Sequence, residues 1–261
     1  MTKKRWITFD LDGTLMQNPF GAWVFPEIAE AVSGRLGRQH DVVSEMVAEH
    51  EARMASGRYV EAYDWDDILR ERLRKLDLAD PFEIEPLVRK HSVPPKVWLL
   101  ESGIREVLAE LKAGGYSLAV VTNGFYKFQA PVMEALGLIE LFDEVVTPER
   151  AGTGKPDPAI LSGLSGQIIA HVGDRLDHDV QLANRSNIAA LFIYRNLPAD
   201  LKSLSPFMRM KDPLGIRLLS EKARKEERNA GWSELPSELL PAALVDSVHE
   251  IPALLDALKE S

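Results

Sequence analysis

Short apolar segments alternate with amphipathic helical patterns along most of the chain, and this alternation constrains the fold more than any other feature. The segments predicted to be strands are 6–9, 116–121, 144–146, 168–172 and 189–194. The segments predicted to be helices between them are 103–111, 129–136, 159–164 and 180–187. A chain that alternates strands with helices forms a parallel sheet covered on both faces. We therefore predict an α/β fold with a doubly wound, Rossmann-like parallel sheet.

Residues 17–97 interrupt this alternation, because they carry amphipathic helical patterns alone. The predicted helices cover 27–36, Asp41 to Met54, Asp64 or Asp66 to Leu76, and 84–88. These aspartates can accept hydrogen bonds from the free backbone N–H groups at helix starts. Four helices without strands predict a small bundle, and Pro94-Pro95 marks a stiff boundary after it. The predicted organisation is an α/β core of residues 1–16 and 98–261, with an inserted helical cap of residues 17–97.

Residues 196–241 are the least regular part of the predicted core. Prolines lie in or beside this segment at positions 198, 206, 213, 236 and 241. A helix predicted over 214–229 carries a mixed run of charges at 221–228, which we interpret as a solvated helix face. A last strand over 243–245 and a closing helix over 251–258 follow. We therefore treat 196–241 as an atypical, Pro-rich and partly helical insertion.

The composition excludes several classes of function. The net charge of −9 argues against a generic nucleic-acid surface or an anionic-membrane surface. The absence of cysteine excludes disulfides, thiolate chemistry and cysteine-based zinc sites. No apolar run approaches the ~20 residues that span a bilayer, and the basic start lacks the long apolar region of a secretory signal. We expect a cytoplasmic protein, a monomer or homodimer, with no nucleic-acid or membrane partner.

Two carboxylates follow the first predicted strand, at the point where the strand should end. Asp10 and Asp12 lie two residues apart, and Gly13 then allows a sharp turn. Clustered carboxylates repel each other and are costly to bury unless a cation lies between them. Mg²⁺ is such a cation, because it prefers oxygen ligands and often takes one or two carboxylates with water and phosphate. The alternative is a surface turn in which Asp12 bonds its own backbone.

Three further polar clusters occur downstream of strand-like segments. They are Thr122-Asn123-Gly124, Lys155 within 154–158, and the stretch 173–179. The carboxyl ends of parallel strands meet at one edge of the sheet, where the sites of such folds lie. Taken singly, residues 122–124 are more often a turn or helix cap, Lys155 a surface lysine, and 177–179 the polar start of a helix. Together the clusters predict one site.

The clusters resemble the four motifs of the haloacid dehalogenase-like (HAD) hydrolase superfamily, in the same order. Asp-Leu-Asp-Gly-Thr-Leu at 10–15 resembles motif I, and Thr-Asn-Gly at 122–124 resembles motif II. Lys155 in Gly-Lys-Pro-Asp-Pro resembles motif III, and the Gly-Asp-x4-Asp pattern of 173–179 resembles motif IV. The helical segment lies between motifs I and II, and this position resembles the C1 type of cap.

The resemblance implies a Mg²⁺-dependent phosphatase that acts through an aspartyl-phosphate. Asp10 would be the nucleophile. Asp12 would be the general acid that protonates the leaving group, and then the base towards water. Mg²⁺ would be held by Asp10, by the backbone carbonyl of Asp12 and by Asp174. Asp179 would lie behind these ligands and orient water or Lys155.

Motifs II and III would bind the phosphate. The Thr122 hydroxyl, the Asn123 amide and the backbone N–H groups that follow Gly124 can donate to phosphate oxygens. Lys155 offers a point cation both to the phosphate and to Asp10. Thr122 and Lys155 therefore join the two aspartates as predicted catalytic residues.

The surroundings of the predicted site carry three further expectations. Phe20, Trp23, Tyr63 and Trp65 are candidate substrate contacts from the cap, and Phe20 and Trp23 are favoured because they follow motif I closely, although aromatic residues more often pack within a core. Arg175 stands where a small residue is frequent in motif IV, so it can crowd or charge the entrance. His178 is expected at the surface or at a helix cap and receives no role.

The predicted function is hydrolysis of a small phosphomonoester, of the nucleotide or sugar phosphate class. Asp12 argues against a true haloacid dehalogenase, which has no phosphate leaving group to protonate. Two alternatives stay open. One is a sugar phosphomutase that uses the same pair of aspartates. The other is a non-catalytic binding protein on the same fold, in which residues 196–241 serve a partner.

Overall fold

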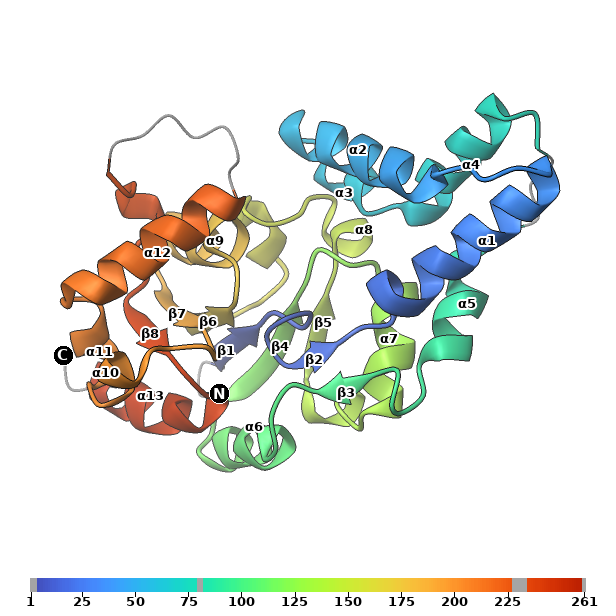
Figure 1. Cartoon of the computed structure of the whole chain (residues 1–261). Helices are drawn as coiled ribbons and strands as arrows, with labels where there is room; N and C mark the ends of the chain where they lie inside the picture. The colour runs from blue at the N-terminus through green and yellow to red at the C-terminus, as the bar shows by residue number, and fades with distance from the viewer. Residues whose placement is uncertain (1–3, 79–81, 227–233, 260–261) are drawn as a thin grey trace.

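The computed structural model describes residues 4–78, 82–226 and 234–259. These residues form a six-stranded sheet with the strand order β5-β4-β1-β6-β7-β8, and every neighbouring pair is parallel (Figure 1). The strands are, in chain order, β1 Arg5–Phe9, β4 Ser117–Val121, β5 Glu144–Val146, β6 Gln167–Gly173, β7 Ala189–Ile193 and β8 Ala243–Val245. The predicted α/β fold with a Rossmann-like parallel sheet is confirmed.

Strand β1 shows why helices cover both faces of the sheet. Ile7 and Phe9 are buried in one apolar cluster, whereas Trp6 is buried in another, because successive side chains of a strand point to opposite faces. The first cluster includes side chains of α6 Ile104–Ala113, α7 Tyr126–Ala135 and α13 Ile251–Lys259. The second includes side chains of η3 Pro158–Leu161 and α9 Gln181–Arg185.

The remaining helical elements of the core are short, apart from one. They are η2 Ile139–Leu141, α8 Pro148–Ala151, η4 Leu176–Val180, α10 Ala199–Lys202, α11 Pro206–Arg209, α12 Pro213–Glu226, η5 Ser237–Leu239 and η6 Val248–Glu250. Across the described part of the chain, no helix combines the length and the apolar character that a membrane span requires.

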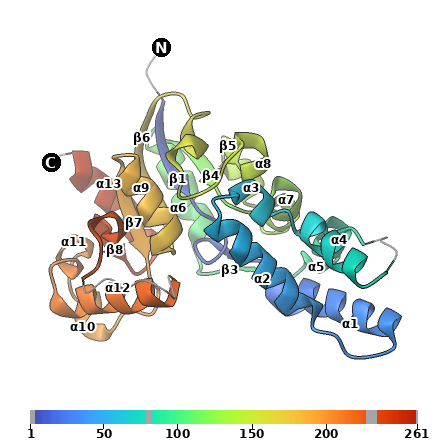
Figure 2. The ribbon, with the colours of Figure 1, turned by 90° about the horizontal axis from the view of Figure 1, so that it is seen from above.

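The segment between β1 and β4 leaves the core and returns to it through two short strands. These strands, β2 Met16–Gln17 and β3 Trp98–Leu99, pair antiparallel with each other. The helices between them are η1 Phe20–Val24, α1 Phe25–Leu36, α2 Val42–Ala55, α3 Tyr59–Ala62, α4 Trp65–Lys75 and α5 Ile84–His91. In two perpendicular views, α1, α2 and α4 lie to one side of the sheet (Figures 1 and 2). The division at residues 17–97 stays a prediction.

Two of the predicted caps are present at the starts of these helices. Asp41 accepts a hydrogen bond from the Ser44 N–H, and Asp64 accepts one from the Asp67 N–H. Asp66 is not the cap of α4. It accepts a hydrogen bond from the Ile84 N–H and forms an ion pair with Lys127 on α7, so it links the helical segment to the core.

Some helices differ from the prediction. The helix predicted over 159–164 is wrong, because the structure has only the short 3₁₀-helix η3, after which Gly163 and Gly166 favour other backbone conformations. The helix predicted over 180–187 begins earlier, with η4. The helix predicted over 129–136 begins at Tyr126 and contains Pro131.

Helix α12 carries the charged run that the sequence placed on a solvated face. Leu219 and Ala223 pack in a cluster with Leu176 and Val180 of η4. The Glu226 side chain is only 5% exposed and accepts a hydrogen bond from the Leu176 N–H. The solvated interpretation is therefore wrong for Glu226, and predicted helix residues 227–229 lie outside the described residues.

Candidate active site

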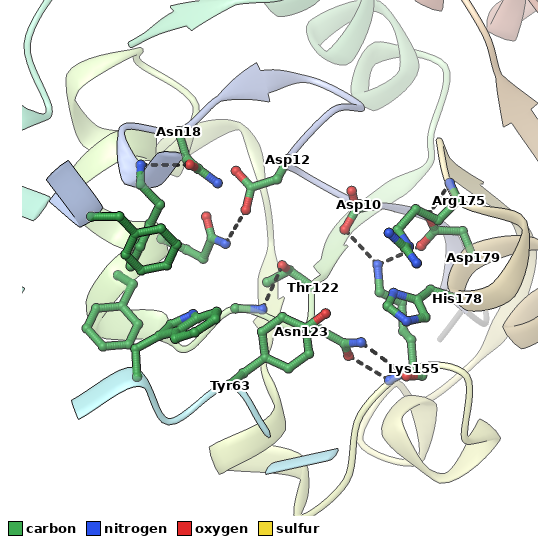
Figure 3. Close-up of a pocket in the computed structure, with 16 residues that line it drawn as sticks. Asp10, Asp12, Asn18, Tyr63, Thr122, Asn123, Lys155, Arg175, His178 and Asp179 are labelled. Carbon is green, nitrogen blue, oxygen red and sulfur yellow. Dashed lines mark hydrogen bonds and ion pairs between the residues drawn. The ribbon is translucent and has the colours of Figure 1, made fainter. Parts of the chain in front are cut away.

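A pocket of about 200 Å³ lies at the carboxyl ends of the central strands. Its lining comes from the chain after β1, from the chain after β4, from Lys155 and from η4, with further side chains from the helical segment (Figure 3). The four sequence motifs thus meet in one place although they extend from Asp10 to Asp179 along the chain. This convergence follows from the parallel topology, because β4 and β6 are both neighbours of β1.

Asp10 stands directly after β1 and is fixed at both carboxylate oxygens. Its backbone N–H donates to the carbonyl of Val172 on β6 at 2.9 Å. Its Oδ1 atom accepts a hydrogen bond from Lys155 Nζ at 2.6 Å, and its Oδ2 atom accepts one from Thr14 Oγ1 at 3.1 Å. Burial raises the pKa of Asp10, and the Lys155 charge opposes that rise. Sequence reasoning quoted Thr14 within motif I but assigned it no role.

Lys155 is 2% exposed and bridges two carboxylates. Its Nζ atom lies 2.6 Å from Asp10 Oδ1 and 2.6 Å from Asp179 Oδ1. Burial alone would lower the pKa of Lys155, but the two carboxylates raise it above the usual range. Lys155 is therefore a buried, permanently charged link between Asp10 and η4, and its neighbours depend on it for charge neutralisation.

Asp179 has more hydrogen-bond donors than the other carboxylates of the site. Besides Lys155, its donors are the Arg175 N–H at 3.0 Å and the His171 ring, whose Nε2 lies 3.0 Å from Oδ1. Burial opposes ionisation, yet Lys155 and His171 hold the pKa of Asp179 well below its usual range. A Cβ on Gly173 would lie 2.2 Å from Asp179 Cγ, so this position requires glycine. Sequence reasoning missed His171, whose only signal is its place within β6.

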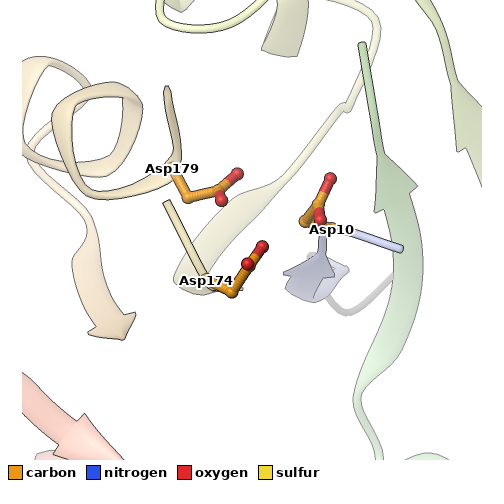
Figure 4. A group of neighbouring side chains, drawn as sticks. All are labelled: Asp10, Asp174 and Asp179. Atoms are coloured by element: carbon orange, nitrogen blue, oxygen red, sulfur yellow. The ribbon is translucent and has the colours of Figure 1, made fainter. Parts of the chain in front are cut away.

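Three carboxylates form a group that fits a divalent cation. One oxygen from each of Asp10, Asp174 and Asp179 lies within 4.8 Å of the others (Figure 4). Burial and the charges of the other two raise the pKa of Asp174 to about 7. Gly13, with φ +83°, passes so close that a Cβ there would lie 2.5 Å from Asp174 Oδ2. A compact set of oxygen donors with excess negative charge suits Mg²⁺, and Asp179 is already engaged by Lys155.

Asp12 is held separately from Asp10. Its Oδ2 atom accepts a hydrogen bond from Gln129 Nε2 of α7 at 2.7 Å. Burial raises the pKa of Asp12 to about 6, and the Gln129 hydrogen bond opposes the rise. A Cβ on Gly124 would lie 2.1 Å from Gln129 Nε2, so Gly124 leaves the room that Gln129 needs to reach Asp12.

The residues of the predicted phosphate-binding cluster have different hydrogen-bond partners, and their role in binding phosphate stays a prediction. Thr122 is buried and lines the pocket, and its Oγ1 accepts a hydrogen bond from the Gly124 N–H at 3.1 Å. The Asn123 amide was predicted to donate to phosphate, but the structure places it on the backbone of Lys155. Its Oδ1 accepts from the Lys155 N–H at 2.7 Å, and its Nδ2 donates to the Lys155 carbonyl at 3.1 Å. Asn123 thus fixes the loop that carries Lys155.

The sequence matches the family model of a haloacid dehalogenase-like hydrolase over residues 4–187. The chain belongs to the haloacid dehalogenase-like hydrolases. It is 30% identical over 208 residues to the glyceraldehyde 3-phosphate phosphatase of Methanocaldococcus jannaschii. That match covers 75% of this chain and 87% of the relative. It is 32% identical over 126 residues to the human haloacid dehalogenase-like hydrolase domain-containing protein 3, which covers 45% of this chain and 50% of the other.

Among solved structures, a HAD phosphatase from Thermococcus onnurineus has a TM-score of 0.66 and 22% identity, and the match covers 98% of both chains. At that identity the likeness concerns the HAD fold alone. The chain spans about half the length of several curated relatives that it matches, between 43% and 57% of them.

The helical segment of this HAD-like chain gives the pocket an aromatic wall. Phe20, Phe25 and Trp65 of this segment line the pocket, and Phe128 of core helix α7 adds a fourth ring. Trp23 does not line the pocket. It is 40% exposed and stacks on His91, with ring centroids 6.0 Å apart. Phe20 and Trp23 both lie on η1, which is a π-helix. The wide turn of a π-helix points side chains three positions apart in different directions.

Two residues of motif IV, Arg175 and His178, line the pocket, and the prediction for His178 was wrong. His178 was expected at the surface or at a helix cap, but its side chain is 12% exposed and lines the pocket, where burial lowers its pKa to about 4. Arg175 also lines the pocket, as the sequence suggested. Its guanidinium donates to both carboxylate oxygens of Asp177, at 2.9 and 2.6 Å, so its charge is already paired.

Proposed function

We propose that the protein is a Mg²⁺-dependent phosphatase that hydrolyses a small phosphomonoester through an aspartyl-phosphate intermediate. One observation carries this proposal. Asp10 and Asp12 both line one pocket, yet each has its own hydrogen-bond partners: Lys155 and Thr14 for Asp10, and Gln129 for Asp12. Two carboxylates fixed independently in one pocket can perform two different tasks, nucleophilic attack and proton transfer.

The first step forms a bond from an Asp10 carboxylate oxygen to phosphorus and breaks the bond from phosphorus to the ester oxygen. Asp12 gives its proton to that leaving oxygen, so a neutral alcohol departs. In the second step, Asp12 takes a proton from water as the water oxygen attacks phosphorus. The Asp10–phosphorus bond breaks, inorganic phosphate leaves, and the Asp10 carboxylate is restored.

The other residues of the site bind the phosphate and fix the nucleophile. Lys155 keeps Asp10 in place and offers positive charge to the phosphate, and the Thr122 hydroxyl offers a hydrogen bond. Mg²⁺, held by Asp10, Asp174 and the Asp12 carbonyl, would reduce the repulsion between the carboxylate and the anionic substrate. Asp179 positions Lys155, and Asn123 fixes its backbone.

Residues 17–97 are proposed to act as a cap of the C1 type. Their side chains complete the pocket, through Asn18, Phe20, Phe25, Tyr63 and Trp65. A cap that encloses the substrate would exclude water other than the attacking molecule. The glyceraldehyde 3-phosphate phosphatase named above supports hydrolysis of a phosphate ester, whereas Asp12 argues against dehalogenation, which needs no such proton donor.

The proposal is tested by phosphate release from nucleotides, sugar phosphates and small organic phosphates, with Mg²⁺ and with EDTA. We expect release that requires Mg²⁺ and is absent in Asp10→Asn. Independently of turnover, Mg²⁺ should raise the melting temperature of the wild type and not that of Asp174→Asn, because a ligand stabilises only the form that binds it. If the protein interconverts sugar phosphate isomers and releases no free phosphate, it is a phosphomutase and the phosphatase proposal is wrong. If it shows neither activity on any of these substrates, both proposals are refuted.

A further inference from the structure

The end of the pocket away from Asp10 is built of aromatic rings. Phe20 lies with its ring centroid 5.4 Å from that of Phe25 and 5.5 Å from that of Phe128, both edge to face. Trp65 lies 5.1 Å from Phe25 and 6.4 Å from Phe20. Three separate segments, 20–25, α4 and α7, supply these rings to one wall. Such a wall offers apolar faces and edges to a bound group.

Each positively charged side chain of the described pocket lining is already paired with carboxylates. Among the described residues that line it, Lys155 and Arg175 carry positive charge. Lys155 is bound by Asp10 and Asp179, and Arg175 is bound through two hydrogen bonds by Asp177. A carboxylate or second phosphate on the substrate would therefore meet no cation reserved for it. Burying an anion without a partner is costly.

The other polar groups along the described lining are neutral or negative. Asn18 accepts a hydrogen bond from the Phe20 N–H at 3.0 Å through its Oδ1 atom, and Gln129 donates to Asp12. The Tyr63 ring also faces the pocket, and burial raises its pKa, which keeps the hydroxyl protonated. These groups suit an uncharged ligand body with few polar atoms.

We infer that this pocket takes the phosphate monoester of an uncharged alcohol that carries an aromatic ring. Water and such an ester give the alcohol and inorganic phosphate, with the ring held against Phe20, Phe25, Trp65 and Phe128. This inference rests on the proposed phosphatase function and adds the chemical class of the leaving group. It separates this chain from a phosphatase for small carboxylated esters, which needs an available cation beside the substrate carboxylate.

The test compares three esters whose leaving groups are primary alcohols, so that intrinsic reactivity differs little. They are 2-phenylethyl phosphate, glycerol 1-phosphate and the phosphate ester of 3-hydroxypropionate. We expect kcat/KM to be at least about tenfold higher for 2-phenylethyl phosphate than for either of the others, because an apolar pocket discriminates by such factors. A preference for the carboxylated ester, or equal values for all three, would overturn the inference while leaving the phosphatase intact.

A matched pair of tryptophan variants tests whether the preference for the aromatic ester comes from the aromatic wall of the pocket. Trp65→Leu should lower kcat/KM for 2-phenylethyl phosphate about tenfold, mainly through KM, and lower that for glycerol 1-phosphate by a clearly smaller factor. Trp23→Leu, which removes an exposed ring outside the pocket, should change neither. Equal losses on both substrates in Trp65→Leu would mean that the ring only supports the fold. Phe25→Leu provides a second test if Trp65→Leu unfolds.

Failure of the proposed function would have a different signature. If no ester releases phosphate, titration calorimetry with the Asp10→Asn variant still measures how the pocket ranks the three esters. Tighter binding of 2-phenylethyl phosphate than of glycerol 1-phosphate would support the aromatic class without hydrolysis. Equal or reversed affinities would refute it.

Discussion

The polar and aromatic ends of the pocket are assembled in different ways. At the polar end, Asp10 and Thr122 directly follow strands β1 and β4, and Asp179 comes from the chain that follows β6, the other neighbour of β1 in the sheet. At the aromatic end, the rings come from η1, α1, α4 and α7, whose relative positions no sheet ladder sets. The polar end is therefore fixed by topology, whereas the aromatic end is fixed by packing between the helical segment and the core. We expect substitutions at the first to affect chemistry and those at the second to affect substrate choice.

The largest effect is expected from the Asp10→Asn substitution. The amide is a poor nucleophile, so turnover should fall by about 10⁴-fold or more on every substrate, aromatic or not. Phosphate release under single-turnover conditions measures this loss. Because the two side chains have the same shape, the circular dichroism spectrum should match that of the wild type. A variant that keeps more than a tenth of the activity would show that Asp10 is not the nucleophile.

A smaller and substrate-dependent effect is expected from Asp12→Asn. The amide cannot give a proton to the leaving oxygen, so turnover of an alkyl ester should fall by about 10²- to 10⁴-fold. 4-Nitrophenyl phosphate should lose much less in its first step, because 4-nitrophenolate leaves without a proton. Burst kinetics separate the first step from the second, so they give the loss of the first step for each of the two esters. Equal losses of the first step for both esters would contradict the general-acid assignment.

The polar end should also contribute more to stability than an exposed ion pair does. Lys155→Met leaves Asp10 and Asp179 buried without their shared cation, and breaking such a buried pair costs about 3–5 kcal/mol of unfolding free energy. Lys90, 58% exposed and paired with Glu27, is the matched control, because exposed pairs contribute about 0–1 kcal/mol. Urea denaturation in EDTA measures both variants. Similar losses for Lys155→Met and Lys90→Met would show that the site relaxes around the missing charge.

The difference between a polar end fixed by topology and an aromatic end fixed by packing explains what the sequence could predict. The order of strands and helices was readable because apolar periodicity is local, and the polar clusters at strand ends marked one edge of the sheet. Asp10, Asp12, Lys155 and Asp174 were found in this way, with the resemblance naming their roles. Asp10, Asp12 and Lys155 line one pocket and Asp174 lies beside Asp10, which agrees with the parallel order of β4, β1 and β6.

Contacts between distant side chains were not readable in the same way. The Asn123 amide binds the Lys155 backbone 32 positions away, and Gln129 reaches Asp12 across 117 positions. Trp23 was chosen for its closeness to motif I, but the geometry of η1 directs it away from the pocket while Phe20 faces inwards. Side-chain direction in a π-helix does not follow from the amphipathic period of an α-helix.

The smallest predicted effect concerns a contact outside both ends of the pocket. Glu226 of α12 accepts hydrogen bonds from the backbone N–H groups of Leu176 at 2.9 Å and Asp177 at 3.4 Å, so the atypical C-terminal segment holds the chain that follows Asp174. Glu226→Gln keeps an acceptor but removes its charge, and it should lower the unfolding free energy by about 1 kcal/mol. Glu221→Gln, an exposed change on the same helix, should have no measurable effect in the same urea titration. If both variants match the wild type, α12 rests on η4 through apolar packing alone, and residues 196–241 stabilise the site's surroundings without a polar link to motif IV.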